Sequence, residues 1–160
     1  LVTYSCNWDH YRAVEFHGDL DVVGLSGYYS LPWDAPMTTE AVESNWREIR
    51  AELVHYSHEI DRPLLFTEIG YPSVHGSARD PWNYTMVGEP DPGEQARSLA
   101  AFFRVWAGTP ELDGVFVWNY SPIRGGDFDT SYSINGKPAS SVVRSWFLHR
   151  TVPTAAGTGR

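Results

Sequence analysis

The sequence predicts an α/β fold that corresponds to the C-terminal half, about strands 5 to 8, of a (β/α)8 barrel with parallel strands. Four short apolar segments are nearly continuous in hydrophobicity, as parallel strands covered on both faces are. Helical patterns separate most of them, and crossover helices imply a parallel sheet. Four such units in about 150 residues are half of what an eight-unit barrel of roughly 250 residues needs.

The predicted strands are rich in β-branched and aromatic residues, and they are Leu1–Ser5, Leu20–Gly27, Pro63–Glu68 and Asp113–Asn119. The predicted helices show apolar residues at helical spacing behind capping or proline signals, and they cover residues 38–60, 92–107 and 138–148. The connection 9–18 is short and only weakly helical. The alternative is a four-stranded doubly wound sheet that is complete in itself.

We assign residues 1–150 to the half-barrel and residues 151–160, which carry small residues and no apolar face, to a flexible tail or linker. The chain opens on Leu1 without an initiator methionine, which favours a piece of a longer protein. We therefore expect the N-terminal half of the barrel as a missing partner. The compartment stays unknown, with an extracellular or periplasmic location as the expectation for the complete protein.

The composition favours a carbohydrate ligand over nucleic acid. Seven Trp, nine Tyr and seven Phe supply ring faces that suit the apolar faces of sugars. The net charge is −8 and Lys137 is the only lysine, so little is available to neutralise a phosphate backbone or an anionic membrane. No apolar run approaches the roughly 18 residues that a membrane span needs. We therefore expect no nucleic-acid partner and no membrane.

The carboxyl ends of barrel strands carry active sites, so the strand ends are read first. The third strand ends at Glu68, where an apolar run makes a carboxylate costly without partners or chemistry. The neighbouring strand ends carry Tyr28 and Tyr29, Trp118, and Asn7 with Trp8. A carboxylate among phenols and indoles is what a sugar-cleaving site requires. The competing interpretation is a glutamate paired with an arginine at the barrel rim.

These segments resemble the clan A glycoside hydrolases, and most closely the family 113 β-mannanases. The most specific part is Phe66-Thr67-Glu68-Ile69-Gly70-Tyr71-Pro72-Ser73, with Trp82 in the loop beyond, which is similar to the seventh strand of that clan. Residues 3–8, 20–31 and 114–119 are similar to the fifth, sixth and eighth strands, and residues 135–139 to the segment before the last helix. The resemblance runs from about residue 1 to residue 147.

The resemblance implies a retaining glycoside hydrolase that cleaves a β-linked polysaccharide, in particular a β-1,4-mannan. Glu68 would be the nucleophile, Tyr28 would hydrogen-bond its carboxylate, and Trp118 would form the floor beneath the sugar. Tyr29 is the fallback for Tyr28. Trp8, Asn7 and Trp82 are expected at neighbouring subsites.

One departure limits this expectation. The clan places its acid/base glutamate after an asparagine at the end of the fourth strand, and no Asn-Glu pair occurs here. Both carboxyls are needed, about 5–5.5 Å apart, for retaining hydrolysis, so this chain alone is expected to be inactive. The alternative function is a non-catalytic carbohydrate-binding module, associated with a cell wall or a phage tail, on a barrel that has lost its chemistry.

The remaining chemistry-bearing residues favour structural roles. His55 and His58 lie three apart on a helix but lack the pattern of a helical zinc motif, and Asp127 and Asp129 are typical of a turn. Cys6 is interpreted as a buried structural thiol, because the sequence places no histidine to activate it. A metal-dependent barrel hydrolase would need His and Asp at the strand ends, which do not carry them. We expect no cofactor and no metal.

Overall fold

A computed structural model describes residues 1–149, so the tail expected at residues 151–160 lies outside the described part. The strands are β1 (Ser5–Cys6), β2 (Val23–Ser26), β3 (Leu64–Ile69) and β4 (Leu112–Val117). The helices are α1 (Thr39–Ile60), α2 (Pro92–Trp106) and α3 (Ala139–His149). Two short 3-10 turns, Tyr11–Ala13 and His17–Asp19, connect β1 to β2, in agreement with the weak helical signal there.

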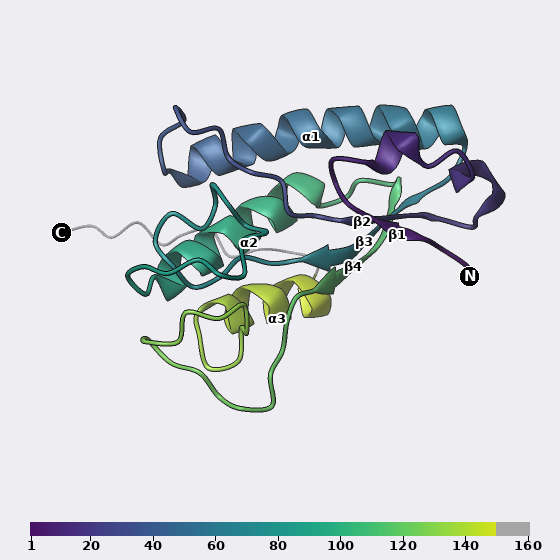
Figure 1. Ribbon diagram of the computed structural model, residues 1–160. Coiled ribbons are helices and arrows are strands. Elements are labelled where there is room, and N and C mark those ends of the chain that lie inside the picture. The colour runs from purple at the N-terminus through teal and green to yellow at the C-terminus, as the bar shows by residue number, and fades with distance from the viewer. Residues whose placement is uncertain (150–160) are drawn as a thin grey trace.

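The four strands form one parallel sheet in the order β1-β2-β3-β4. The helices lie side by side, with α1 against α2 and α2 against α3 (Figure 1). Sequential strand order with neighbouring helices is the winding of a barrel, whereas a doubly wound sheet reverses its order and carries helices on both faces. The architecture is therefore that of half a (β/α)8 barrel, as predicted.

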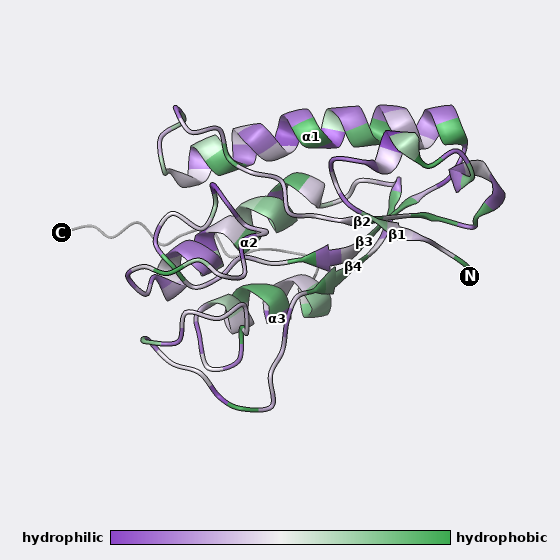
Figure 2. Cartoon of the chain, viewed as in Figure 1, coloured by the Kyte–Doolittle hydropathy of each residue, from purple (hydrophilic) through white to green (hydrophobic). Residues whose placement is uncertain are grey.

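The helix boundaries follow from the local sequence. Thr38 caps α1 by accepting a hydrogen bond from the Ala41 amide, and Asp61 ends the helix in the left-handed conformation. Asp91 caps α2 in the same way by accepting from the Glu94 amide, with Pro92 in the first turn. Polar and apolar residues alternate along α1, as expected of a helix with one buried face (Figure 2). Within residues 1–149, no helix combines the length and hydrophobicity that a bilayer span requires.

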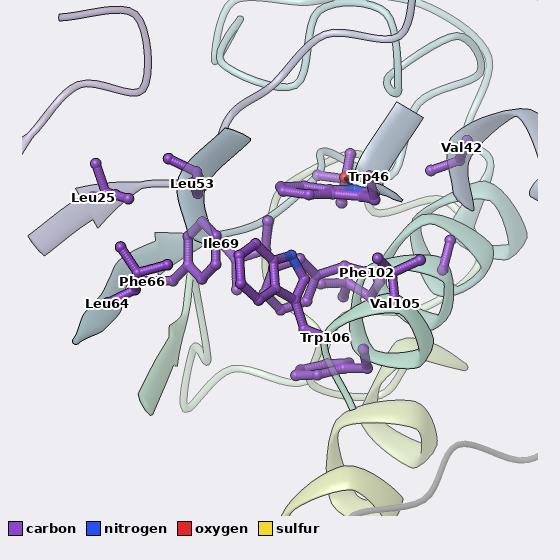
Figure 3. Close-up of a cluster of buried hydrophobic side chains, with 14 of the residues drawn as sticks. Leu25, Val42, Trp46, Leu53, Leu64, Phe66, Ile69, Phe102, Val105 and Trp106 are labelled. Carbon is purple, nitrogen blue, oxygen red and sulfur yellow. Dashed lines mark hydrogen bonds between the residues drawn. The ribbon is translucent and has the colours of Figure 1, made fainter. Parts of the chain in front are cut away.

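The core lies between the sheet and the helices, on what we call the outer face of the sheet. Phe66 of β3 contacts Phe102 and Trp106 of α2 edge to face, with ring centroids 5.1 and 5.0 Å apart. Trp46 of α1 packs on Phe102 at 4.9 Å and donates its indole hydrogen to the Tyr71 hydroxyl (Figure 3). These rings are almost fully buried. They fix α1 and α2 against β3, the strand that carries Glu68.

The first strand is shorter than predicted. The sequence pattern favoured Leu1–Ser5, whereas only Ser5–Cys6 pairs with β2. Leu1 and Val2 are exposed at the edge of the sheet. Before Ser5 the chain meets the segment ahead of β2 only through isolated hydrogen bonds, such as that from the Asp21 amide to the Val2 carbonyl over 3.1 Å, so its apolar character does not translate into regular pairing over its whole length.

Candidate active site

Glu68 lies near the carboxyl end of β3, and a close approach of two strands places Tyr28 next to it. The Gly27 amide donates to the Glu68 carbonyl over 2.6 Å. A Cβ atom at Gly27 would lie 2.9 Å from the Phe66 ring and 3.1 Å from the Glu68 carbonyl oxygen. The absence of a side chain at Gly27 therefore lets the chain after β2 run against the end of β3.

Tyr28 donates its hydroxyl hydrogen to Glu68, with 2.7 Å between Oη and Oε2. Burial, followed by the adjacent Glu68 carboxylate, raises the pKa of the Tyr28 phenol, so this phenol stays a donor. Within residues 1–149, Glu68 makes no ion pair, which removes the competing interpretation of an arginine-bound rim glutamate. The carboxylate is half-buried, hydrogen-bonded and free of a cation.

The Tyr28 ring is held between two other aromatic rings. Trp8, which follows β1, meets it edge to face with ring centroids 6.2 Å apart, and Tyr132, in the loop after β4, does so at the same distance. Tyr132 also donates its hydroxyl to the Pro81 carbonyl over 2.6 Å, which ties that loop to the loop carrying Trp82. Sequence reasoning missed Tyr132, because it lies in an irregular loop where no periodic pattern marks it.

Trp118 reaches the same end of the sheet. Its amide donates to the Ile69 carbonyl over 2.8 Å, directly beyond β4. A Cβ atom at Gly70 would stand 2.1 Å from the Trp118 carbonyl oxygen, so only glycine allows this approach. The Trp118–Asn119 peptide bond is cis. The Trp118 side chain is 46% exposed, which leaves ring surface available to a ligand.

The other predicted site residues separate into two groups. Tyr29 packs on Trp46 of α1, with ring centroids 5.5 Å apart, and so lies on the core side of the chain. The partner of Glu68 is therefore Tyr28, and the sequence could not choose between the two. Asn7 is exposed at the carboxyl end of β1, and Trp82 is exposed in the loop after β3. Within residues 1–149, neither makes a hydrogen bond to Glu68.

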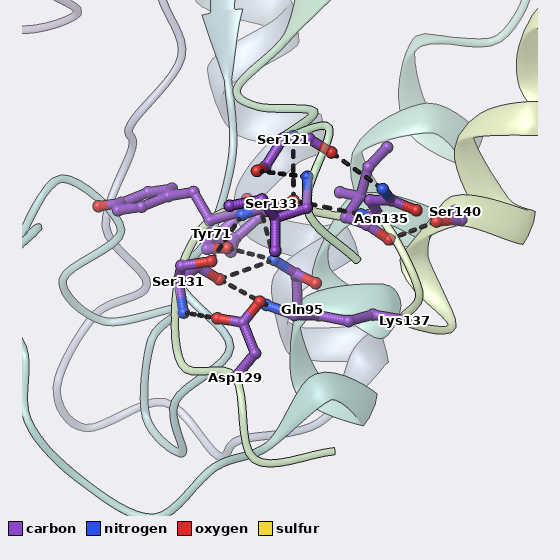
Figure 4. A network of polar contacts seen from close by, with 12 residues as sticks. Tyr71, Gln95, Ser121, Asp129, Ser131, Ser133, Asn135, Lys137 and Ser140 are labelled. Atoms are coloured by element: carbon purple, nitrogen blue, oxygen red, sulfur yellow. Dashed lines mark hydrogen bonds and ion pairs between the residues drawn. The ribbon is translucent and has the colours of Figure 1, made fainter. Parts of the chain in front are cut away.

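A buried polar network holds the loop after β4 in place (Figure 4). Gln95 of α2 donates to the carbonyls of Tyr71 and Tyr132 over 2.9 and 3.1 Å. The buried ammonium of Lys137 donates to the Ser131 carbonyl over 2.8 Å and pairs with Asp129 at 3.3 Å. Asp129 also accepts from the Ser131 amide, which is the turn role expected for it. The network positions Tyr132, and through it the Tyr28 ring.

Among residues 1–149, one group of possible metal ligands comes together, which the sequence did not predict. His75, Asp91 and Glu94 lie within 4.8 Å of one another. Both Glu94 oxygens already accept hydrogen bonds from residues 76–78, and Asp91 caps α2. The positive end of a helix also disfavours a cation. The group therefore serves to anchor the loop between β3 and α2 to the start of α2.

The remaining titratable residues fit structural roles. Cys6 is buried, as expected, but its sulfur lies 3.8 Å from His17 Nε2, so a histidine is near after all. Burial raises the pKa of the Cys6 thiol to about 11, which is the opposite of an activated nucleophile. His55 and His58 are exposed and contact Glu59 and Glu111 respectively, as surface residues do.

Comparison with known proteins places this geometry in a family. The model of Glycoside Hydrolase Family 113 matches residues 1–137. A GH113 β-mannanase from Alicyclobacillus acidocaldarius, solved in complex with ManMIm, is 31% identical with a TM-score of 0.80. The match covers 94% of this chain and 46% of that one. A GH113 β-1,4-mannanase, solved as a complex, is 25% identical with a TM-score of 0.78, covering 92% and 45% of the two chains.

A β-glucuronidase from Bifidobacterium dentium shares only the fold, at 19% identity and a TM-score of 0.61 over 90% of this chain and 23% of that one. No curated protein matches the chain. The chain spans slightly less than half the length of the family 113 structures. The chain belongs to glycoside hydrolase family 113, and its four parallel strands are the C-terminal half of a (β/α)8 barrel.

Proposed function

We propose that the complete barrel, meaning this half joined to a complementary N-terminal half, is a retaining glycoside hydrolase with Glu68 as its nucleophile. The observation that carries the proposal is the 2.7 Å hydrogen bond from Tyr28 to a Glu68 carboxylate that has no cationic partner among residues 1–149. A nucleophilic carboxylate has to be ionised and oriented, yet not neutralised by a fixed cation. A phenol donor meets these requirements.

The reaction needs two carboxyl groups. Glu68 attacks the anomeric carbon while an acid protonates the leaving oxygen, and a glycosyl ester forms on Glu68. Water then cleaves this ester with the second carboxyl acting as base. The sequence contains no Asn-Glu pair to supply that group, so we assign the acid/base to the complementary half. This chain alone is then inactive.

The aromatic residues around Glu68 suit a sugar chain. Trp118, which is 46% exposed, would form the floor beneath the sugar, and Trp8, Asn7 and Trp82 would contribute to neighbouring subsites. Tyr29 packs on Trp46 in the core and is assigned no part in the reaction. We take a β-1,4-mannan as the substrate, because the similar family 113 structures are described as β-mannanases.

The test is the release of reducing ends from mannan by the complete barrel and its variants. Glu68→Gln should lower kcat by at least about 10³-fold, because loss of a nucleophile removes the covalent step. Tyr28→Phe should give an intermediate loss of about 10–100-fold, since the donor to the carboxylate disappears but the carboxylate remains.

The matched control is Glu89→Gln, which changes an exposed carboxylate in the loop after β3 and should leave kcat unaltered. Circular dichroism and thermal unfolding establish that each variant is folded. Full activity in folded Glu68→Gln would refute the assignment. Saturable mannan binding without turnover in the unaltered complete barrel would instead favour a non-catalytic carbohydrate-binding module.

A further inference from the structure

A hollow of about 490 Å³ lies beside the loop that follows β4. It is lined by residues of that loop and of the first two turns of α3, among them Tyr120, Arg124, Ser141 and Arg144. None of its lining residues is acidic. In a chain with a net charge of −8, a hollow with two guanidinium groups and no carboxylate is a local reversal of charge.

Arg124 and Arg144 differ from the other arginines of the described part. Each of the other arginines in residues 1–149 has a carboxylate or carbonyl partner, and these are Arg12, Arg47, Arg50, Arg62, Arg79, Arg97 and Arg104. Within the same residues, Arg124 and Arg144 have neither an ion pair nor a hydrogen bond. The two arginines without such a partner therefore both line one hollow, and both are exposed to solvent.

The backbone under Arg124 is fixed rather than loose. The Gly125 amide donates to the Asn135 carbonyl over 2.9 Å, and the Asn135 side chain donates to the Ser121 carbonyl over the same distance. Gly136 has a φ of +81°, and a Cβ atom there would stand 2.5 Å from the Arg124 side chain. The stem of the Arg124 side chain therefore packs against Gly136, whose backbone conformation favours glycine.

The third cation near the hollow is already neutralised. Lys137 is bound by Asp129 and by the Ser131 carbonyl. The first amides of α3 are also engaged, because Ser140 donates to the Lys137 carbonyl and Ser141 to the Pro138 carbonyl. The capacity for a ligand therefore rests on the two guanidinium groups, together with the Tyr120 and Ser141 hydroxyls.

We propose that this hollow binds an oxyanion, namely the carboxylate or phosphate group of an acidic saccharide. Guanidinium groups bind both through paired, charge-assisted hydrogen bonds, and hydroxyl donors suit the sugar. Tyr120 is two residues beyond Trp118, so the ligand would lie at the same end of the sheet as Glu68. The proposal does not depend on Glu68 being a nucleophile.

Isothermal titration of the full chain with glucuronate, inorganic phosphate and glucose tests this proposal. Glucuronate or phosphate should bind saturably and glucose should not. Tighter binding of glucuronate identifies a sugar carboxylate as the source of the oxyanion, and tighter binding of phosphate identifies a phosphate ester. Arg124→Gln combined with Arg144→Gln should weaken the bound anion at least about tenfold, because charge-assisted hydrogen bonds are lost.

The matched control combines Arg47→Gln with Arg97→Gln, which removes the same charge from exposed arginines on α1 and α2 and should leave the affinity unchanged. Thermal unfolding verifies that both double variants are folded. Absence of saturable binding of both anions would overturn the proposal. Equal weakening in the two double variants would overturn it as well, since the effect would then come from net charge alone.

Discussion

The two faces of the sheet differ in how far their side chains are buried. On the outer face, Phe66 and Phe102 are completely buried against one another. On the opposite face, which we call the inner face, Phe116 of β4 is 63% exposed, while its neighbours Val115 and Val117 pack on the core. A complete barrel fills its interior with side chains from all its strands. The outer face is thus part of a fully packed core. The inner face is exposed, and we expect a second half-barrel to cover it.

The largest expected effect comes from truncating one aromatic ring on each face. Phe102→Ala should lower the free energy of unfolding of the chain by about 3–5 kcal/mol, because it opens a cavity among buried rings. Phe116→Ala should change it by less than about 1 kcal/mol, since an exposed ring loses little on removal. Urea unfolding of the chain measures both. Similar losses in the two variants would show that the faces do not differ in this way.

The same pair of variants sharpens the comparison in the complete barrel. There the cost of Phe116→Ala should rise toward about 3 kcal/mol, because the ring becomes part of the barrel interior. An unchanged small cost would mean that the inner face stays open even with the second half present.

An intermediate effect is expected where the loop between β3 and α2 is anchored to α2. The Glu94 carboxylate, almost fully buried, accepts from the Gly76 and Ala78 amides and from the Ser77 hydroxyl. Glu94→Ala should cost about 1–3 kcal/mol, because buried donors lose their acceptor. Glu89→Ala, an exposed change in the same loop, is the control. Urea unfolding compares the two, and equal small losses would remove this anchor from the account.

The smallest expected effect concerns the contact between the two loops that border Glu68. Tyr132→Phe removes the hydroxyl that donates to the Pro81 carbonyl, at a cost of about 0.5–1.5 kcal/mol. The ring contact with Tyr28 stays. Hydrogen exchange of residues 76–89 should increase, since the loop carrying Trp82 loses a tether. If hydrogen exchange in this loop is unchanged, the loop is held by the hydrogen bonds of Glu94 and not by the Tyr132 hydroxyl.

Much of the fold is predictable because local patterns and packing agree. Caps at Thr38 and Asp91 mark the two long helices, and continuous apolar runs mark β2, β3 and β4. The strand at Leu1–Ser5 was predicted less well, since an edge segment can be apolar without pairing along its length. The winding order followed from the alternation of strands with helices, and the structure confirms it.

The candidate site is predictable where its residues follow strands, but not where they lie in loops. Parallel strands align their carboxyl ends, and the sequence shows which residues follow each strand. It therefore predicts that one end of the sheet carries Glu68, Tyr28 and Trp118. The choice between Tyr28 and Tyr29 depends on a close approach at Gly27, and the contact of Tyr132 with Pro81 joins residues 51 positions apart. Such contacts leave no periodic signal, so only the structure locates them.

The most direct test of the central claim is to trap the covalent intermediate in the complete barrel. A 2-deoxy-2-fluoro mannoside with a good leaving group should form a long-lived ester, because the fluorine slows its hydrolysis. Peptide mass spectrometry should then find the sugar on Glu68, and no label should appear in Glu68→Gln. A label on a different carboxylate, or steady turnover of mannan with no ester on Glu68, would contradict the assignment of the nucleophile.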